Sequence, residues 1–181
     1  MGKKLIEKEI ERETKFSGRL LGLRVDTVEL PHGKKTTREV VEHPGAVAVV
    51  AITKDQELVL VRQFRKPAEQ IMLEIPAGCI KKGESGSDCA RRELEEETGF
   101  YARKISKAWS GFATPGYSDE VIQFYIAEDM NRLQARPDED ELVEVELVDI
   151  EACLDMLKRG KINDLKTMLG ILLANMYFND Q

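Results

Sequence analysis

Long apolar runs are missing from this chain of 181 residues. Its longest uninterrupted apolar stretches, such as residues 46–52, have the length of one strand, whereas a membrane-spanning helix needs about 20 apolar residues. Residues 1–13 are charged throughout and lack the apolar segment of a secretion signal, and Gly2 is not followed by the Ser or Thr of a myristoylation site. We therefore expect no membrane partner and no targeting segment.

Cysteine and clustered positive charge are also scarce. Cys79, Cys89 and Cys153 are odd in number and lack the spacing of a metal site, which favours the reducing cytoplasm. No Lys/Arg-rich block offsets the formal net charge of -6, and no internal repeat or low-complexity segment is present. These absences argue against a nucleic-acid partner and leave a small molecule as the expected one.

The residues that are present divide the chain into an N-terminal unit and a main domain. Residues 1–43 contain apolar positions from Phe16 to Leu30, a turn at 31–34 and a β-prone stretch, which predicts an antiparallel β-hairpin. This unit is too small to build its own core, so it must pack on the main domain or on a second copy of the chain. We predict a dimerisation unit over 1–43 and one domain over 44–181.

The main domain shows strand patterns before and after one helix, with two further helices at the end. This order predicts an α+β fold in which helices cover a mixed sheet. The predicted strands span 46–53, 57–65, 72–76, 105–109, 121–127 and 141–148, and the helices span 89–98, 150–159 and 164–178.

The first of these helices has clear local signals at both ends. Residues 85–88 offer several N-cap candidates, residues 89–98 contain strong helix formers, and Gly99 ends the pattern. On a helical wheel the apolar side carries Ala90 and Leu94, and the solvent side carries Arg91 and Glu95.

Three carboxylates share the remaining face of this helix. Glu93, Glu96 and Glu97 lie three and four positions apart and project within roughly 100° of each other. They repel each other unless one is protonated or a hard divalent cation such as Mg2+ binds them. The spacing predicts a metal site, and the alternative is a charged face that only meets water.

This helix and the loop before it resemble the Nudix box, in which glycine, glutamate, Arg-Glu and Glu-Glu pairs, glycine and a hydrophobic residue follow at fixed intervals. The matching residues are Gly78, Glu84, Arg92, Glu93, Leu94, Glu96, Glu97, Gly99 and Phe100. The resemblance implies an α/β/α sandwich and metal-dependent hydrolysis of a nucleoside diphosphate linked to another moiety, with Mg2+ as the expected ion and Mn2+ as the alternative.

The resemblance also implies roles for individual residues. Glu93 and Glu97 would bind the metal directly, as would the Ala77 carbonyl. Glu96 would act as a catalytic residue and as a direct or water-mediated ligand. A pair between Glu84 and Arg92 would fix the loop to the helix, and we favour this structural role for Arg92 because arginine pairs with carboxylates in bidentate fashion.

Segments outside the box resemble ADP-ribose pyrophosphatases of the same family. TPGYSDE resembles their loop around the terminal ribose, and Pro115 stands where they carry a proline. The alternative is a plain Pro-Gly turn. The contacts carried over from this loop are Thr114, Pro115, Gly116 and Glu120.

The strands before the box, TREVVEHPGAVAVV and LVRQFRKP, resemble the same subfamily. They make Arg38 and Arg65 candidate contacts of adenosine and phosphate, although arginine in a strand is often a surface residue. Phe16 is either a residue that stacks on adenine across a dimer interface or an ordinary hairpin core residue.

The acidic run 138–141 would supply the general base, as the corresponding loop does in the subfamily. The alternation of Val143, Val145 and Leu147 sets the register, and from it we choose Glu139 as base and Glu141 as a further metal contact. Asp138 and Asp140 either share this role or keep the loop solvated.

The leading hypothesis is a cytoplasmic, domain-swapped homodimer that hydrolyses ADP-ribose to AMP and ribose 5-phosphate with Mg2+. One alternative substrate is another nucleoside diphosphate sugar, such as a GDP-sugar. The alternative from a different class is a non-catalytic nucleotide sensor on the same scaffold.

Overall fold

The computed structural model describes residues 5–132 and 142–179. The chain divides into two compact units. The first consists of Met1–Gly45 with Gly111–Ile122, and the second consists of Ala46–Ser110 with Gln123–Gln181.

The first unit is built on three antiparallel strands in the order β1-β2-β3. They are β1 (Lys8–Ser17), β2 (Gly22–Glu29) and β3 (Lys35–Glu42). The antiparallel arrangement of β2 and β3 around the turn at 31–34 confirms the predicted hairpin. The sequence prediction missed the separate strand β1, because its charged residues show no apolar alternation; a charged strand is nevertheless a common way to protect the edge of a sheet.

The second unit contains the remaining strands, in the orders β10-β5-β6 and β7-β4-β9-β8. The strand β4 is buried at every position, as its continuous apolar sequence predicts. The strands are β4 (Ala46–Ala51), β5 (Glu57–Arg65), β6 (Gln70–Glu74), β7 (Ala77–Cys79), β8 (Phe100–Phe112), β9 (Val121–Arg132) and β10 (Val143–Asp149), and a 3-10 turn spans Lys66–Ala68.

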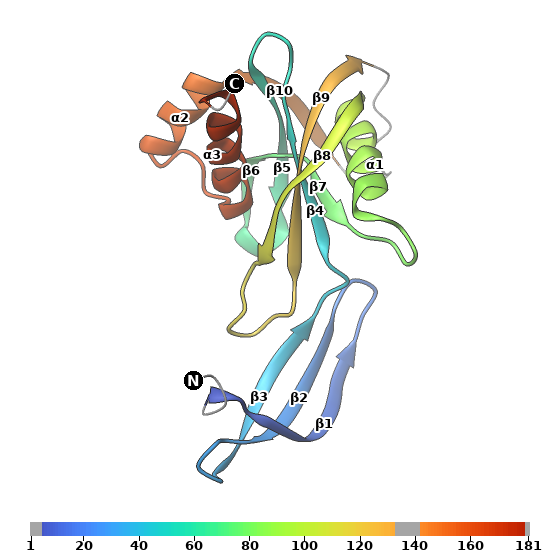
Figure 1. Cartoon of the computed structure of the whole chain (residues 1–181), viewed down its shortest axis with the longest axis vertical. Helices are drawn as coiled ribbons and strands as arrows, with labels where there is room; N and C mark the ends of the chain where they lie inside the picture. The colour runs from blue at the N-terminus through green and yellow to red at the C-terminus, as the bar shows by residue number, and fades with distance from the viewer. Residues whose placement is uncertain (1–4, 133–141, 180–181) are drawn as a thin grey trace. The chain divides into compact units, whose positions relative to one another are not determined.

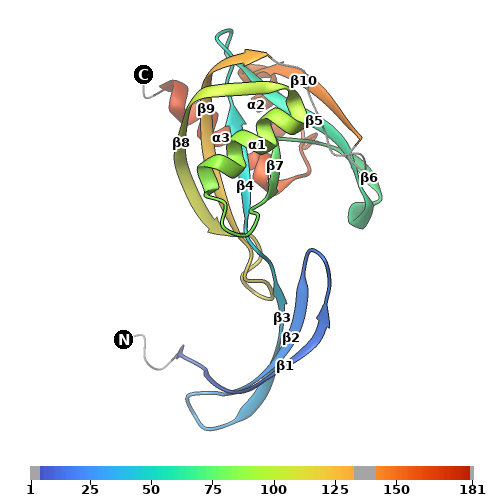
Figure 2. The ribbon, with the colours of Figure 1, turned by 90° about the vertical axis from the view of Figure 1, so that its right-hand side faces the viewer.

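Helices cover both faces of these strands. The helix α1 (Gly86–Thr98) lies on one side, and α2 (Ile150–Lys158) and α3 (Leu165–Asn179) lie together on the other (Figures 1 and 2). This arrangement confirms the predicted α+β fold with a mixed sheet between helical layers. No helix within the described part of the chain is long and apolar enough to cross a membrane.

The ends of α1 follow from its sequence. The Ser85 hydroxyl accepts a hydrogen bond from the Asp88 backbone N–H at 3.1 Å and so caps the first turn. Gly99 ends the helix in the left-handed conformation, with φ of 70°, and its N–H donates to the Glu95 carbonyl at 2.9 Å. A glycine adopts this conformation without the steric cost that other residues meet.

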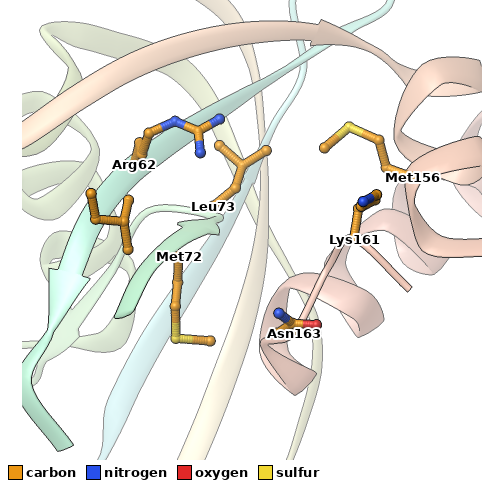
Figure 3. Close-up of a pocket in the computed structure, with 7 residues that line it drawn as sticks. Arg62, Met72, Leu73, Met156, Lys161 and Asn163 are labelled. Carbon is orange, nitrogen blue, oxygen red and sulfur yellow. The ribbon is translucent and has the colours of Figure 1, made fainter. Parts of the chain in front are cut away.

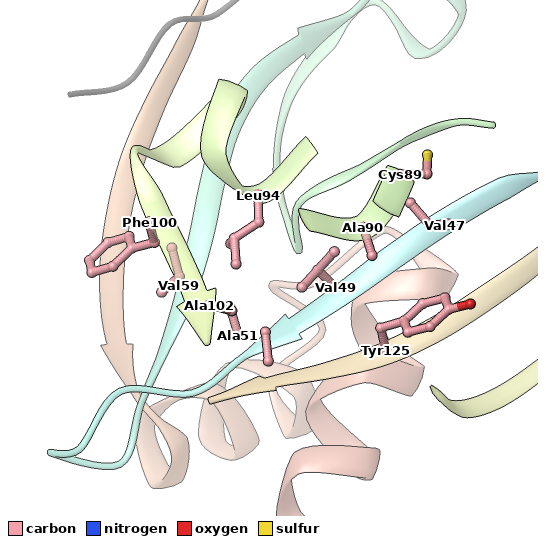
Figure 4. Packing of buried hydrophobic residues seen from close by; sticks show 11 residues of the cluster. Val47, Val49, Ala51, Val59, Cys89, Ala90, Leu94, Phe100, Ala102 and Tyr125 are labelled. Atoms are coloured by element: carbon pink, nitrogen blue, oxygen red, sulfur yellow. The ribbon is translucent and has the colours of Figure 1, made fainter. Parts of the chain in front are cut away.

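The apolar side of α1 packs on the sheet and forms the centre of the core. Leu94, Ala90 and Cys89 are fully buried against Val47 and Val49 of β4 (Figure 4). The core therefore fixes the rotation of α1 about its own axis, so that the opposite face carries the carboxylates in a defined position.

We predict that Leu94→Ala destabilises the fold by about 2–5 kcal/mol, because it removes apolar contacts and leaves a cavity in a fully buried site. Urea denaturation followed by circular dichroism measures the change. Leu165→Ala is the control, since it makes the same substitution in the helix α3 at a side chain that is 74% exposed. Equal losses in the two variants would contradict the assignment of Leu94 to the core.

Candidate active site

The carboxylates of α1 face the short strand β7. Glu93 and Glu97 are buried, at 9% and 5% exposure, whereas the Glu96 side chain is 30% exposed. The Ala77 backbone N–H donates to Glu97 Oε2 at 3.3 Å. The helix and the strand thus place two buried carboxylates beside the backbone of Ala77, whose carbonyl is one of the predicted metal ligands.

Arg92 is the cation that balances this acidic face. Its Nε and Nη2 atoms donate to the two carboxylate oxygens of Glu84 at 2.7 and 2.9 Å. Its Nη1 donates to Glu93 Oε1 at 2.7 Å and to Glu96 Oε2 at 2.9 Å. The structure therefore brings Glu84 and Arg92 together in a bidentate pair, and the same guanidinium also joins two of the carboxylates on its own helix.

The ion pair changes the acidity of Glu84. The hydrogen bond from Arg92 is the main cause that lowers the pKa of Glu84 from 4.5 to about 2, and the Lys81 backbone N–H adds to it. The neighbouring thiol behaves in the opposite way, because burial raises the pKa of Cys89 to about 12. The loop before α1 thus carries a firmly ionised carboxylate, while the nearby cysteine stays a thiol.

Gly78 allows the close approach between β7 and α1. A Cβ atom built on Gly78 would lie 2.0 Å from both the carboxyl carbon and Oε1 of Glu93. Real Cβ atoms do not approach other atoms this closely, so every other residue would displace either the strand or the Glu93 side chain. The glycine that opens the motif is therefore required by packing against a carboxylate.

The side chains present suit a hard divalent cation by their chemistry. Three carboxylates on one helix face, beside a backbone that only glycine lets come close, form the oxygen-rich donor set that Mg2+ prefers. Among residues 5–132 and 142–179, however, no group of three His, Cys, Asp or Glu side chains is arranged to hold a metal. Glu93 and Glu96 instead pair with Arg92, so a cation that binds both carboxylates would have to compete with the guanidinium.

A second buried ion-pair network lies at Arg65 and was missed by the sequence prediction. Arg65 donates through Nε and Nη2 to the two oxygens of Glu74, at 2.8 and 2.7 Å, and Lys166 also donates to Glu74. Burial alone would raise the pKa of Glu74, which is 1% exposed, but Arg65 and Lys166 hold it below its usual range. The local signal for this network is a lone glutamate at the end of β6, directly after three apolar residues.

This network fixes both the arginine and the start of α3. Asp164 accepts from Lys166 Nζ at 2.9 Å and from the Thr167 hydroxyl at 2.5 Å, and Thr167 in turn accepts from the Ile75 backbone N–H at 2.9 Å. The guanidinium of Arg65 is thereby held in one orientation, and it is close enough to Glu97 for the charge of that carboxylate to raise its pKa, after the larger effect of Glu74.

The surroundings of the Arg91 side chain differ from the sequence prediction. The helical wheel places it on the solvent side, but its guanidinium donates to the backbone carbonyls of Ala102 and Arg103 in β8. The strand β8 begins directly after Gly99, so its first carbonyls lie beside α1 and attract the side chain. A wheel for one helix cannot include the strand that follows it.

The predicted substrate contacts of the first unit lie in two places. Phe16 is 55% exposed on β1, and Arg38 on β3 donates to the Glu7 carboxylate. The loop between β8 and β9 holds Thr114, whose carbonyl accepts from the backbone N–H groups of Tyr117 and Ser118 at 3.1 and 2.9 Å. The remaining predicted contacts of this loop are Pro115, Gly116 and Glu120. Glu139 and Glu141 lie outside the described residues.

A pocket of about 230 Å³ lies elsewhere in the second unit, between β6 and the segment around α2. Figure 3 shows Leu73 and Met156 pointing toward each other across it, with Arg62 and Lys161 among the residues that line it. The seven residues drawn there include none of those predicted for the site. This pocket is therefore separate from the candidate active site.

The ion pair of Glu84 leads to a pH-dependent prediction. A carboxylate whose pKa is lowered by folding stabilises the folded state above its unfolded pKa of 4.5, and this contribution disappears as the pH falls toward 2. We expect Glu84→Gln to be less stable than the unchanged chain at pH 6, with a smaller difference at pH 3.5. Urea titrations at both pH values measure it, and a difference that does not shrink would contradict the lowered pKa.

Comparisons with known proteins agree with this geometry. The model of the NUDIX domain matches residues 42–169. An ADP-ribose pyrophosphatase of Bacillus subtilis (strain 168) is 45% identical over 171 residues, which cover 93% of this chain and 92% of that protein. A methanol dehydrogenase activator of Bacillus methanolicus is 44% identical, with 94% of each chain covered.

More distant matches include a GDP-mannose pyrophosphatase of Yersinia pestis (strain Pestoides F), which is 31% identical over 78% of this chain and 76% of its own length. A crystal structure of an ADP compounds hydrolase matches with a TM-score of 0.87 and 25% identity, covering 99% of this chain and 98% of that one. With the box residues assembled on α1 and β7, and with similarity along nearly the whole chain, this protein belongs to the Nudix hydrolase family.

Proposed function

We propose that the protein hydrolyses ADP-ribose to AMP and ribose 5-phosphate in the presence of Mg2+. The observation that carries the proposal is the pair of buried carboxylates, Glu93 and Glu97, held beside the close backbone of Ala77 and Gly78. Water attacks one phosphorus of the diphosphate, the bond from that phosphorus to the bridging oxygen breaks, and the other phosphate leaves with the bridging oxygen and its electron pair. A proton of the attacking water passes to a base.

Glu93, Glu97, Glu96 and the Ala77 carbonyl would hold the cation, with Glu141 as a further contact. A bound divalent ion supplies positive charge that stabilises the oxygens of the diphosphate as negative charge develops on them. Arg92 has the supporting role, because its pair with Glu84 fixes the loop before α1 while its third nitrogen balances Glu93 and Glu96. Glu139 takes the proton of the attacking water.

The remaining predicted residues are proposed to determine substrate specificity. Arg65 presents a guanidinium whose orientation is set by Glu74, and planar guanidinium groups suit phosphate oxygens. Arg38 and Phe16 are proposed to contact adenosine. The loop that contains Thr114, Pro115, Gly116 and Glu120 is proposed to surround the terminal ribose. The support for ADP-ribose over other nucleotides is the sequence identity of 45% to a protein named for that activity.

A second candidate substrate is a GDP-sugar, and it is favoured by one observation only. The GDP-mannose pyrophosphatase match is 31% identical and covers less of both chains than the ADP-ribose pyrophosphatase match. A non-catalytic nucleotide sensor is disfavoured because the carboxylates of the box on α1 are all present. A panel of ADP-ribose, GDP-mannose and ADP-glucose, ranked by kcat/KM, separates these possibilities.

The protein is proposed to act in the cytoplasm as a domain-swapped homodimer without a nucleic-acid or membrane partner. The support for the dimer is the first unit itself, where apolar side chains remain exposed just before β1, along it and in the turn after it. Leu5, Ile6, Ile10, Phe16 and Leu20 are between 43% and 84% exposed. A single chain gains nothing from exposed apolar residues in this number, whereas a second copy would bury them.

The catalytic proposal predicts that the purified protein releases AMP from ADP-ribose only when Mg2+ or Mn2+ is added. Glu97→Gln should lower kcat by at least about a hundredfold, because it removes a charged ligand, and Glu139→Gln should lower it by about 10²–10⁴-fold through loss of the base. Chromatographic measurement of AMP gives the rates.

Glu95→Gln is the matched control for Glu97→Gln, because it removes the same charge from the same helix at a position that the box pattern does not specify. Its rate should stay within about twofold of the unchanged protein. An unchanged protein that releases no AMP, or a Glu97→Gln variant that keeps full activity, would overturn the proposed function.

The dimer proposal predicts that a triple substitution of Leu5, Ile6 and Ile10 by serine yields monomers, because it removes apolar side chains from the surface that a second copy would cover. Light scattering coupled to size-exclusion chromatography measures the mass. A protein that is already monomeric before substitution and is fully active would contradict the dimer.

A further inference from the structure

The loop between β8 and β9 belongs to the N-terminal sheet. Its flanking strands lie mainly in the second unit, yet residues Gly111–Ile122 group with Met1–Gly45. Two backbone hydrogen bonds join the loop to β3. The Val41 N–H donates to the Tyr117 carbonyl at 2.7 Å, and the Asp119 N–H donates to the Val41 carbonyl at 3.2 Å. Val41 and Ser118 form a parallel bridge, so the loop extends the sheet beyond its edge strand β3.

Side chains hold the same junction. Asp119 Oδ1 accepts from the His43 backbone N–H at 2.8 Å, and Asp119 Oδ2 lies 3.8 Å from Arg24 Nη1. Arg24 donates from the same Nη1 atom to Glu42 Oε1 at 2.6 Å, and its Nε lies 3.0 and 3.1 Å from the two oxygens of Asp26. One guanidinium on β2 thus serves three carboxylates, of which one belongs to β2, one to β3 and one to the loop.

The centre of this cluster is buried, whereas the Glu42 and Asp119 side chains at its edge are 40% and 46% exposed. The Arg24 side chain is 14% exposed, and Asp26 is 6% exposed. Exposed pairs contribute little because water screens them, but a partly buried guanidinium with several carboxylates is held in one orientation. Arg24 therefore presents a fixed cation 3.8 Å from Asp119 Oδ2, while Asp119 Oδ1 accepts from the His43 backbone N–H.

Hydrogen bonds within residues 113–120 close the turn, so we treat it as one rigid unit. Thr114 O accepts from two backbone N–H groups, the Ala113 N–H donates to the Glu120 carbonyl at 3.0 Å, and the Glu120 N–H donates to the Ser118 hydroxyl at 3.1 Å. A closed turn has few ways to deform internally. Its placement is then determined by where residues 117–119 attach to β3.

We propose that Arg24 and Asp119 are positioning residues for substrate recognition: they seat the loop 114–120 on the edge of β3 and so determine how well the chain binds the terminal ribose. This inference rests on the proposed function, in which that loop surrounds the ribose. It assigns the N-terminal sheet a second task beside dimerisation, because the sheet carries the recognition loop. Neither residue touches the reacting atoms.

The test uses variants of Arg24 and Asp119 that leave the buried carboxylate of Asp26 in place. Arg24→Lys keeps a cation beside Asp26 but loses the bidentate geometry. Asp119→Ala removes both the acceptor for His43 and the partner of Arg24, whereas Asp119→Asn can still accept from the His43 N–H. Asp129→Asn is the matched control, since Asp129 is 50% exposed with an arginine at 4.0 Å, compared with 46% and 3.8 Å for Asp119.

Two measurements separate positioning from a general loss of structure. We expect Arg24→Lys and Asp119→Ala to raise KM for ADP-ribose about tenfold with kcat changed less than about twofold, because a misplaced contact loop weakens binding of the ribose. The inhibition constant of ADP, which lacks the terminal ribose, should stay unchanged. Asp119→Asn should fall between Asp119→Ala and the unchanged protein, and Asp129→Asn should resemble the unchanged protein.

Amide hydrogen exchange provides a readout that does not depend on activity. In Arg24→Lys and Asp119→Ala the N–H groups of Val41 and Asp119 should exchange at least about tenfold faster, while amides of β4 keep their protection. An unchanged protein that does not hydrolyse ADP-ribose would overturn the proposed function, and the exchange data would still decide whether these residues hold the loop. Normal exchange in the variants, an unchanged KM, or an equal weakening of ADP and ADP-ribose would overturn the inference.

Discussion

The second unit depends on how one guanidinium compensates the negative charge of α1. Arg92 lies among three carboxylates and donates hydrogen bonds to all of them, those of Glu84, Glu93 and Glu96. Removing one member of such a partly buried group leaves an unbalanced charge, which costs far more than the pair contributes when complete. The loop before α1, the strand β7 and the carboxylate face of the helix are therefore held together by one residue.

Local signals account for what could be predicted about this region. The helix was expected over 89–98 with a cap among 85–88, and it spans Gly86–Thr98 with Ser85 as cap, because capping serine and terminal glycine act within one turn of themselves. The shared face of the carboxylates follows from helical periodicity. Their relation to β7 does not, since the close approach at Gly78 depends on how a strand and a helix pack in three dimensions.

The networks that sequence patterns could not predict join residues far apart in the chain. Glu74 meets Lys166 across 92 positions, and Asp119 meets His43 across 76. A lone glutamate in an apolar strand indicates that some partner must exist, because an isolated buried charge is costly, but it does not say which cation serves it. The strand β1 was missed for a related reason, since its pairing with β2 comes from backbone bonds and leaves no apolar alternation in its sequence.

The attachment of residues 117–119 to β3 makes the first unit discontinuous in sequence. A cut near Gly45 separates the polypeptide into two plausible halves, but it leaves the loop from 111 to 122 without the strand edge and the Arg24 guanidinium that seat it. Chimaeras between relatives would therefore combine cleanly only when both segments come from the same parent. For inheritance as well as for engineering, the N-terminal sheet and this distant loop form a single module.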